Sequence, residues 1–132
     1  MAPPKVRSFA WRLATDSLAN WTNKVKRKLE VSPLCPVCGM EEEDSFHVLC
    51  SCNHARVLWK LMAKEWKLPS RSLLKPVGSD WFINLLSELN DEGRVHVIML
   101  FWRIWFVRNE IVHHKQPPPM DVSVRFLSSF FF

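Results

Sequence analysis

Cysteine and histidine side chains crowd one short stretch of this chain, residues 35–52. All four cysteines of the sequence lie there together with one histidine, a density that packing alone seldom requires. Cys35 and Cys38 are separated by two residues, a gap that lets both thiolates face one ion from a tight turn. Gly39 follows and allows the chain to fold back. This pair predicts half of a zinc site.

The second half of the site must come from the residues up to position 52. Zinc prefers thiolate and imidazole ligands that close a tetrahedron. The spacing C-x2-C-x8-H-x4-C favours one structural zinc ion held by Cys35, Cys38, His47 and Cys52. We expect residues 44–49 to form about one to two helical turns that fix the His47 ring toward the paired thiolates. Such a closed shell leaves no open position for a substrate or an activated water.

Cys50 is the rival ligand. A shell of Cys35, Cys38, Cys50 and Cys52 is chemically sound, but it asks two cysteines one residue apart to reach one ion. We therefore expect Cys50 to pack as a small apolar side chain. Four buried free cysteines, or two disulfides, are the alternative to a metal site. His54 is interpreted as an ordinary surface or capping histidine.

Charge is distributed unevenly along the 132 residues. Residues 1–34 carry seven Lys or Arg against two acids, and residues 53–80 carry six against two. Residues 35–52 carry four acids, Glu41 to Asp44, and no base, which we interpret as a solvated turn. A basic scaffold around an acidic knuckle suggests a polyanion such as nucleic acid, although a merely solvated surface explains such charge as well.

Helical periodicity predicts a mainly α fold, with a small helical zinc knuckle followed by a helical, partly truncated tail. A first helix starts at Pro3 and Pro4, and a second starts near Asn20 and would bury Val25 and Leu29. Apolar side chains after Cys52 recur along one side of a third helix, and basic side chains recur along another. The candidate contacts to nucleic acid are the basic residues of the second and third helices: Lys24, Lys26, Arg27, Lys28, Arg56, Lys60, Lys64 and Lys67.

The second half of the chain is predicted to be helical but incompletely covered. Trp81–Leu89 forms a short helix, and Val95–Val112 is apolar nearly all round. Its uninterrupted apolar run is far below the ~20 residues that a bilayer span requires, so we expect no membrane association. Such a helix is either buried on several sides or covered by a partner. In this chain by itself, we expect much of the apolar surface of the helix to be exposed. The apolar segment FLSSFFF should be exposed as well.

These patterns divide the chain into four parts. They are a zinc-binding domain (3–67), a linker (68–80), a helical tail (81–115) and an irregular C-terminus (116–132).

The order of the motifs resembles a known family. The run Lys5–Arg12 ahead of C-x2-C-x8-H-x4-C, with Ala55 and Trp59 behind it, is similar to the zinc-binding domain that follows the reverse transcriptase in plant LINE-type (non-LTR) retroelement polyproteins. A second signature, Trp102-x-x-Trp105-x-x-Arg108-Asn109, resembles the helix that precedes a ribonuclease H region in those polyproteins. The resemblance assigns the metal role to the same four ligands.

The resemblance implies a retroelement-derived fragment that is not itself an enzyme, because the chain lacks room for a polymerase palm and lacks the carboxylate set of ribonuclease H. Expected partners are RNA or single-stranded DNA, and a helical or ribonuclease H-like domain on the apolar tail. The alternatives are a structural or protein-interaction module, or a relic without a selected function. The sequence shows no secretory signal, and zinc thiolates fit a reducing compartment, so we expect an intracellular protein, nuclear or cytoplasmic.

Overall fold

The computed structural model describes residues 3–30, 32–113 and 116–131. Its longer helices are α1 (Pro4–Ala14), α2 (Trp21–Lys26), α3 (Asn53–Met62), α4 (Trp81–Ser87), α5 (Asp91–Val112) and α6 (Met120–Ser128). Short helical turns are η1 (His47–Ser51, a π-helix), η2 (Arg71–Leu73) and η3 (Ser129–Phe131). Within the described residues, extended pairing is limited to one isolated bridge between Leu34 and Glu42. The predicted mainly helical fold is confirmed.

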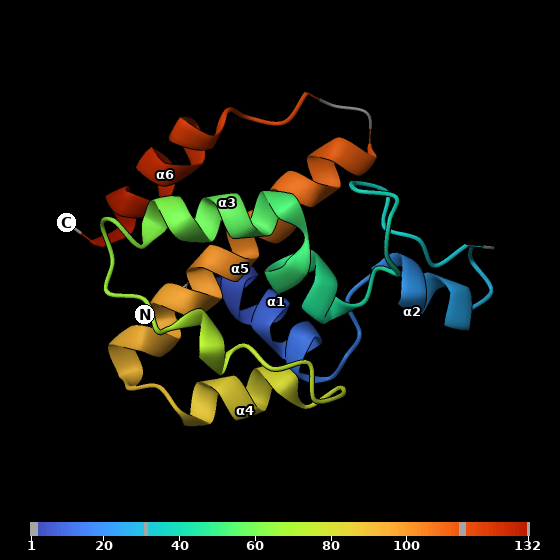
Figure 1. The fold of residues 1–132 in the computed structure, drawn as a ribbon, viewed down its shortest axis with the longest axis horizontal. Helices are drawn as coiled ribbons and strands as arrows, with labels where there is room; N and C mark the ends of the chain where they lie inside the picture. Colours follow the sequence, from blue (N-terminus) through green and yellow to red (C-terminus); the bar gives the residue numbers. More distant parts are fainter. Residues whose placement is uncertain (1–2, 31, 114–115, 132) are drawn as a thin grey trace.

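Helix α5 runs through the middle of the molecule, and other helices pack against it on several sides (Figure 1). It contacts α1, η1, α3 and α6, and the rings of Trp81 and Phe82 on α4 lie against Phe101. Neighbours on several sides explain why its sequence is apolar nearly all round. Asn90 begins the helix, because its side chain accepts a hydrogen bond from the Gly93 amide at 2.8 Å.

The prediction that much of this helix is exposed is wrong. Phe101 and Ile104 are fully buried, and Val107 is nearly so. Among the described large apolar residues of α5, Phe106 is the exposed one, at 38% of its surface. The alternative of a helix buried on several sides fits the structure, because helices from both halves of the chain cover α5.

The C-terminal part is also more ordered than predicted. Residues 116–132 were expected to be irregular, but α6 forms directly after Pro119, whose fixed φ suits the start of a helix. Leu127 is fully buried, and the ring of Phe126 packs on Trp102 with centroids 5.8 Å apart. Phe132, the last residue of the segment FLSSFFF, lies outside the described residues.

Helix α2 is shorter than the periodicity predicts. It ends at Lys26, and Lys28 has a φ of +59°, a left-handed conformation that turns the chain away. Leu29 is therefore 67% exposed rather than buried, and Val25 is half-buried. Asn20 caps the helix as its position suggests, by accepting from the Asn23 amide at 2.8 Å.

The predicted linker, residues 68–80, contains the short turn η2 and is attached to the knuckle. Arg71 donates from Nη2 to the carbonyl oxygen of Cys50 at 2.7 Å, and its guanidinium lies 5.6 Å from the ring centre of Trp59. The segment therefore lies along the protein instead of hanging between two bodies. In the part of the chain that the structure describes, none of the helices is both long and apolar enough to cross a bilayer.

Candidate metal centre

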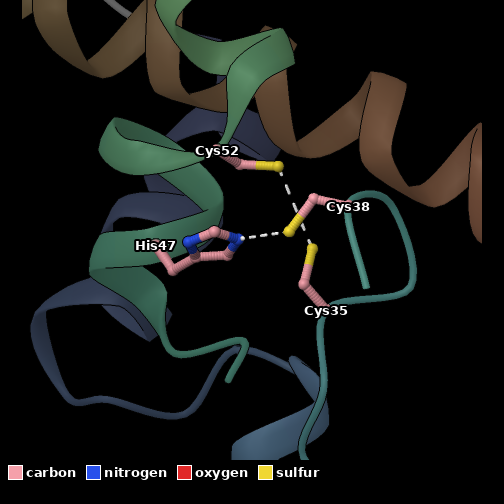
Figure 2. Close-up of side chains that lie close together, drawn as sticks. All are labelled: Cys35, Cys38, His47 and Cys52. Atoms are coloured by element: carbon pink, nitrogen blue, oxygen red, sulfur yellow. Dashed lines mark hydrogen bonds between the residues drawn. The ribbon is translucent and has the colours of Figure 1, made fainter. Parts of the chain in front are cut away.

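Four side chains converge beside the start of α3. The sulfur atoms of Cys35, Cys38 and Cys52 and a ring nitrogen of His47 all lie within 4.8 Å of one another. Figure 2 shows the two sides of the site: Cys35 and Cys38 come from the loop, and His47 from the helical turn that leads to Cys52. Three of the four side chains are buried and that of Cys38 is half-buried.

The separations within this group fit a tetrahedral zinc ion. Zinc–sulfur bonds of about 2.3 Å and zinc–nitrogen bonds of about 2.0 Å place two sulfurs about 3.8 Å apart, and a sulfur and a nitrogen about 3.5 Å apart. The Sγ atoms of Cys35 and Cys52 are 3.9 Å apart, and Cys38 Sγ lies 3.4 Å from His47 Nε2. The donor set and its spacing therefore suit one metal ion.

The loop from Cys35 to Met40 is shaped to present two sulfurs. The Gly39 amide donates to the Cys35 carbonyl at 2.8 Å, and Gly39 closes the turn with a φ of +67°. Backbone amides also point at the sulfurs, from Val37 to Cys35 Sγ at 3.4 Å and from Met40 to Cys38 Sγ at 3.5 Å. Such donors favour the thiolate form, which is the form that binds metal.

His47 is held by its own helical turn. The Asp44 carboxylate accepts from the His47 amide at 2.8 Å, and the residues that follow form the π-helical turn η1. Glu41 lies on the far side of the ring, with Oε2 2.9 Å from Nδ1, although this contact lacks the alignment of a hydrogen bond. An acid beside the second ring nitrogen is a usual way to orient a metal-binding histidine.

The thiols of Cys35 and Cys52 influence each other. The hydrogen bond with Cys52 lowers the pKa of Cys35 to about 4. The same contact with Cys35, together with burial, raises the pKa of Cys52. One thiolate is thus favoured before any cation arrives. A positive ion between the sulfurs would favour the second as well, because an opposite charge stabilises the ionised form.

Cys50 lies outside this group. Its side chain is fully buried within the hydrophobic core, and burial raises the pKa of its thiol. The π-helical turn directs residue 50 into the core, while Cys52, beyond the end of the turn, faces the other ligands. All four cysteines are free, so the structure contains neither of the two disulfides that the sequence allowed as an alternative.

Comparison with known proteins supplies independent evidence for this site. Residues 1–59 match the family described as zinc-binding in reverse transcriptase. All four side chains that converge on the site lie within the matched residues. No curated protein and no solved structure gives a significant match.

Beside this candidate metal site lies a further charged residue that the sequence did not single out. Glu43, predicted to belong to a solvated acidic turn, is completely buried. It forms two hydrogen bonds to Arg108, one of them from Nε to Oε2 at 2.9 Å, and it accepts from the Trp21 amide at 2.8 Å. Its Oε2 also lies 4.0 Å from Cys35 Sγ. The prediction is therefore wrong for Glu43 and holds for its exposed neighbours Glu41 and Glu42.

Arg108 reaches this site from outside the matched segment. Its side chain is 2% exposed, and its guanidinium lies 4.7 Å from the ring centre of Trp105 and 5.5 Å from that of Trp21. Two aromatic rings and a carboxylate thus hold one buried cation. The signature Trp102-x-x-Trp105-x-x-Arg108 pointed to this helix, but it gave no sign that Arg108 contacts the knuckle.

His54, which the sequence suggested to be an ordinary surface or capping histidine, lies in the first turn of α3. It is half-buried next to Cys52, and burial lowers its pKa to about 4. The neutral imidazole is therefore the favoured form at neutral pH. It does not belong to the converging group, so the structure supports the original choice of ligands over His54.

The predicted nucleic-acid contacts lie on two separate helices. On α2 and the turn after it, Lys26, Arg27 and Lys28 are exposed, and Lys24 Nζ lies 4.2 Å from the ring centre of Trp21. On α3 and the turn after it, the exposed cations are Arg56, Lys60, Lys64 and Lys67. Helix α2 stands at one end of the molecule while α3 lies over the middle of α5 (Figure 1). The two groups therefore do not form one stripe.

Proposed function

We propose that this chain is a retroelement-derived module that holds one structural zinc ion and binds RNA or single-stranded DNA weakly and without sequence preference. The convergence of three thiols and one imidazole at the separations of a zinc tetrahedron carries the proposal. Four protein ligands fill the usual shell of zinc, so the ion would stabilise the fold rather than act on a substrate. The segment match to a zinc-binding family of reverse transcriptases supports the same assignment.

The nucleic-acid part of the proposal rests on charge. The chain carries a formal net charge of +5, and the exposed cations of α2 and α3 offer contacts to phosphates that carry no sequence information. A plant LINE-type polyprotein, in which the module would help a polymerase hold its template, is the origin that we infer from the resemblance. In such a polyprotein, α5 would lie in the segment ahead of a ribonuclease H region.

Metal analysis of ligand variants tests the first half of the proposal. The protein purified from a reducing buffer should contain about one zinc ion per chain. Cys38→Ser and His47→Ala should each release it, whereas Cys50→Ser is the matched control and should retain it, because Cys50 faces the core. A Cys50→Ser protein that loses its zinc while His47→Ala keeps it would refute this ligand set.

Binding of labelled oligonucleotides tests the second half. The wild-type protein should bind short oligouridine and oligothymidine with an affinity that falls steeply as salt rises. Replacing Lys60 and Lys64 by Ala should lower the dependence of log Kd on log salt by about 1.4, at about 0.7 for each phosphate that no longer pairs with a lysine. The absence of binding by wild type even at low salt would contradict the proposal.

One observation favours a second candidate, a structural module whose knuckle fastens helices together. The buried contact between Glu43 and Arg108 joins the metal loop to α5 directly. A protein that holds zinc, folds cooperatively and binds no oligonucleotide would support this candidate instead.

A further inference from the structure

A groove of about 390 Å³ lies between α1 and α5, and among the described residues that line it there is no metal ligand and no cation of α3. Its walls include the rings of Phe9, Trp102 and Trp105, and its rim carries Lys5, Ser8 and Arg12. Apolar pockets with a few polar groups at their edge are the usual form of a ligand site. Among the described residues that line it, none is acidic.

The aromatic walls of the groove are fixed in place and partly open. Both tryptophans of α5 are half-buried, and each packs on a neighbour, Trp102 on Phe126 and Trp105 on the guanidinium of Arg108. A ring that is already held by packing loses little conformational freedom when a flat ligand stacks on it. Such rings serve as stacking platforms for nucleobases.

A third tryptophan stands beside the groove on α1. Trp11 is 68% exposed, more than the exposed phenylalanines Phe106 and Phe130. It follows Ser8 by three residues, so it lies next to Ser8, a residue of the groove's rim, on the helix surface. The core does not account for this side chain, since Val6, Phe9 and Leu13 form the buried face of α1.

Positive charge is placed on the same face. Lys5 and Arg12 line the groove and are exposed, and no hydrogen bond or ion pair with an acid is found for either in the described structure. Arg7, on the same helix, does not line the groove, and it lies on the Trp11 side of α1 because it precedes Trp11 by four residues. Flat aromatic surface flanked by cations complements the bases and phosphates of a single strand. A helical peptide is the other ligand that could occupy such a groove, but its binding would not require the cations.

We propose that the groove between α1 and α5 binds a segment of single-stranded nucleic acid, with bases stacked on Trp11, Trp102 and Trp105 and phosphates paired with Lys5 and Arg12. This inference rests on the proposed nucleic-acid function and adds a second surface that the basic residues of α2 and α3 do not include. It places base contacts and two phosphate contacts on α1 and α5, in addition to the phosphate contacts of the exposed cations elsewhere.

Fluorescence anisotropy of labelled oligouridine and oligothymidine, titrated with the full-length zinc-loaded protein, tests the groove. Trp11→Ala should raise Kd about 5- to 150-fold, the range for removal of one stacked base, and Trp11→Phe should recover part of the affinity. Lys5→Ala with Arg12→Ala should lower the salt dependence of log Kd by about 1.4. Lys75→Ala with Arg125→Ala removes the same charge from exposed positions outside the groove and should change binding much less.

Two failures are distinguishable in this experiment. If wild type binds neither RNA nor DNA, the proposed function and the groove both fail. If wild type binds, but the Trp11→Ala and Lys5/Arg12 variants match the Lys75/Arg125 control, the groove is overturned while the proposed function stands. All substituted positions are exposed, so equal zinc content and equal unfolding curves should confirm that each variant folds.

Discussion

The two halves of the molecule are stabilised by different contacts. In the matched segment, residues 1–59, polar groups and the four converging ligands shape the loops around the knuckle. The second half contributes mainly apolar helix surface, and α5 alone supplies six fully buried or nearly fully buried apolar side chains to the core: Val97, Met99, Leu100, Phe101, Ile104 and Val107. The first half thus carries the metal ligands, whereas both halves contribute to the hydrophobic core.

The halves are nevertheless joined at three polar contacts. From the second half, Arg108 binds Glu43, Arg71 donates to the Cys50 carbonyl, and Trp81 Nε1 donates to Ser45 Oγ at 2.9 Å. Each contact reaches the stretch that carries the metal ligands. The family match ends at residue 59, but the structure does not divide there, because one hydrophobic core contains residues from both sides of that position.

Removing the second half should have the largest effect on the folding of the first. A chain ending at Pro69 lacks α5, which covers η1 and its fully buried residues Val48 and Leu49. It also leaves Glu43 without its buried cation. We expect this chain to lose cooperative unfolding and to associate, as followed by circular dichroism and sedimentation. A monomeric, zinc-loaded and cooperatively folded chain 1–69 would show that the first half is independent.

Breaking the buried ion pair should have the next largest effect. Glu43→Gln keeps the shape of the side chain but leaves the Arg108 charge without its carboxylate, which should cost about 3–5 kcal/mol of unfolding free energy. Denaturant unfolding at saturating zinc measures this cost. The matched control is Arg125→Gln, which removes an exposed pair with Asp121 and should change stability by less than about 0.5 kcal/mol. Equal effects of the two substitutions would mean that the buried pair does not join the halves.

A neutral contact across the boundary should matter less. Ser45→Ala removes the acceptor of the buried Trp81 indole N–H, which should cost about 1–3 kcal/mol because that donor stays buried without a partner. Ser87→Ala removes an exposed hydroxyl on α4 and serves as the control. Denaturant midpoints at constant slope compare the two. A decrease in stability at Ser45 no larger than the decrease at Ser87 would contradict a contribution from this hydrogen bond.

The smallest expected effect is a pH dependence of folding stability that comes from His96 in the second half. His96 stacks on Trp66 with ring centres 4.4 Å apart, and burial lowers its pKa below the ordinary value of 6.5. The folded state therefore favours the neutral ring, so the stability that His96 contributes is complete above pH 6.5 and declines as the pH falls below it.

His96→Phe isolates this titration, because it keeps an aromatic ring on Trp66 and removes the proton. Both proteins carry the same metal ligands, so the difference between their unfolding free energies cancels the acid sensitivity of the metal centre. We expect that difference to shift in favour of His96→Phe as the pH falls from neutral to below 6.5. A difference that does not vary with pH would rule out His96 as the source.

The sequence by itself determined the local features of this protein. Ligand spacing acts over eighteen residues, Cys35 to Cys52, so the turn at Gly39 and the helical segment around His47 bring the four side chains together with little help from distant chain. Helix existence was predictable for the same reason, since apolar periodicity and end signals such as Pro4 and Asn20 act within a few residues.

Only the tertiary structure decided which acid is buried and what covers α5. Glu41, Glu42 and Glu43 are alike in sequence, and the burial of Glu43 depends on Arg108, which lies 65 residues away. Likewise, the apolar surface of α5 indicates burial but not which helices provide it. Hydrophobic contact is non-directional, so the choice among partners is made by packing the whole chain at once.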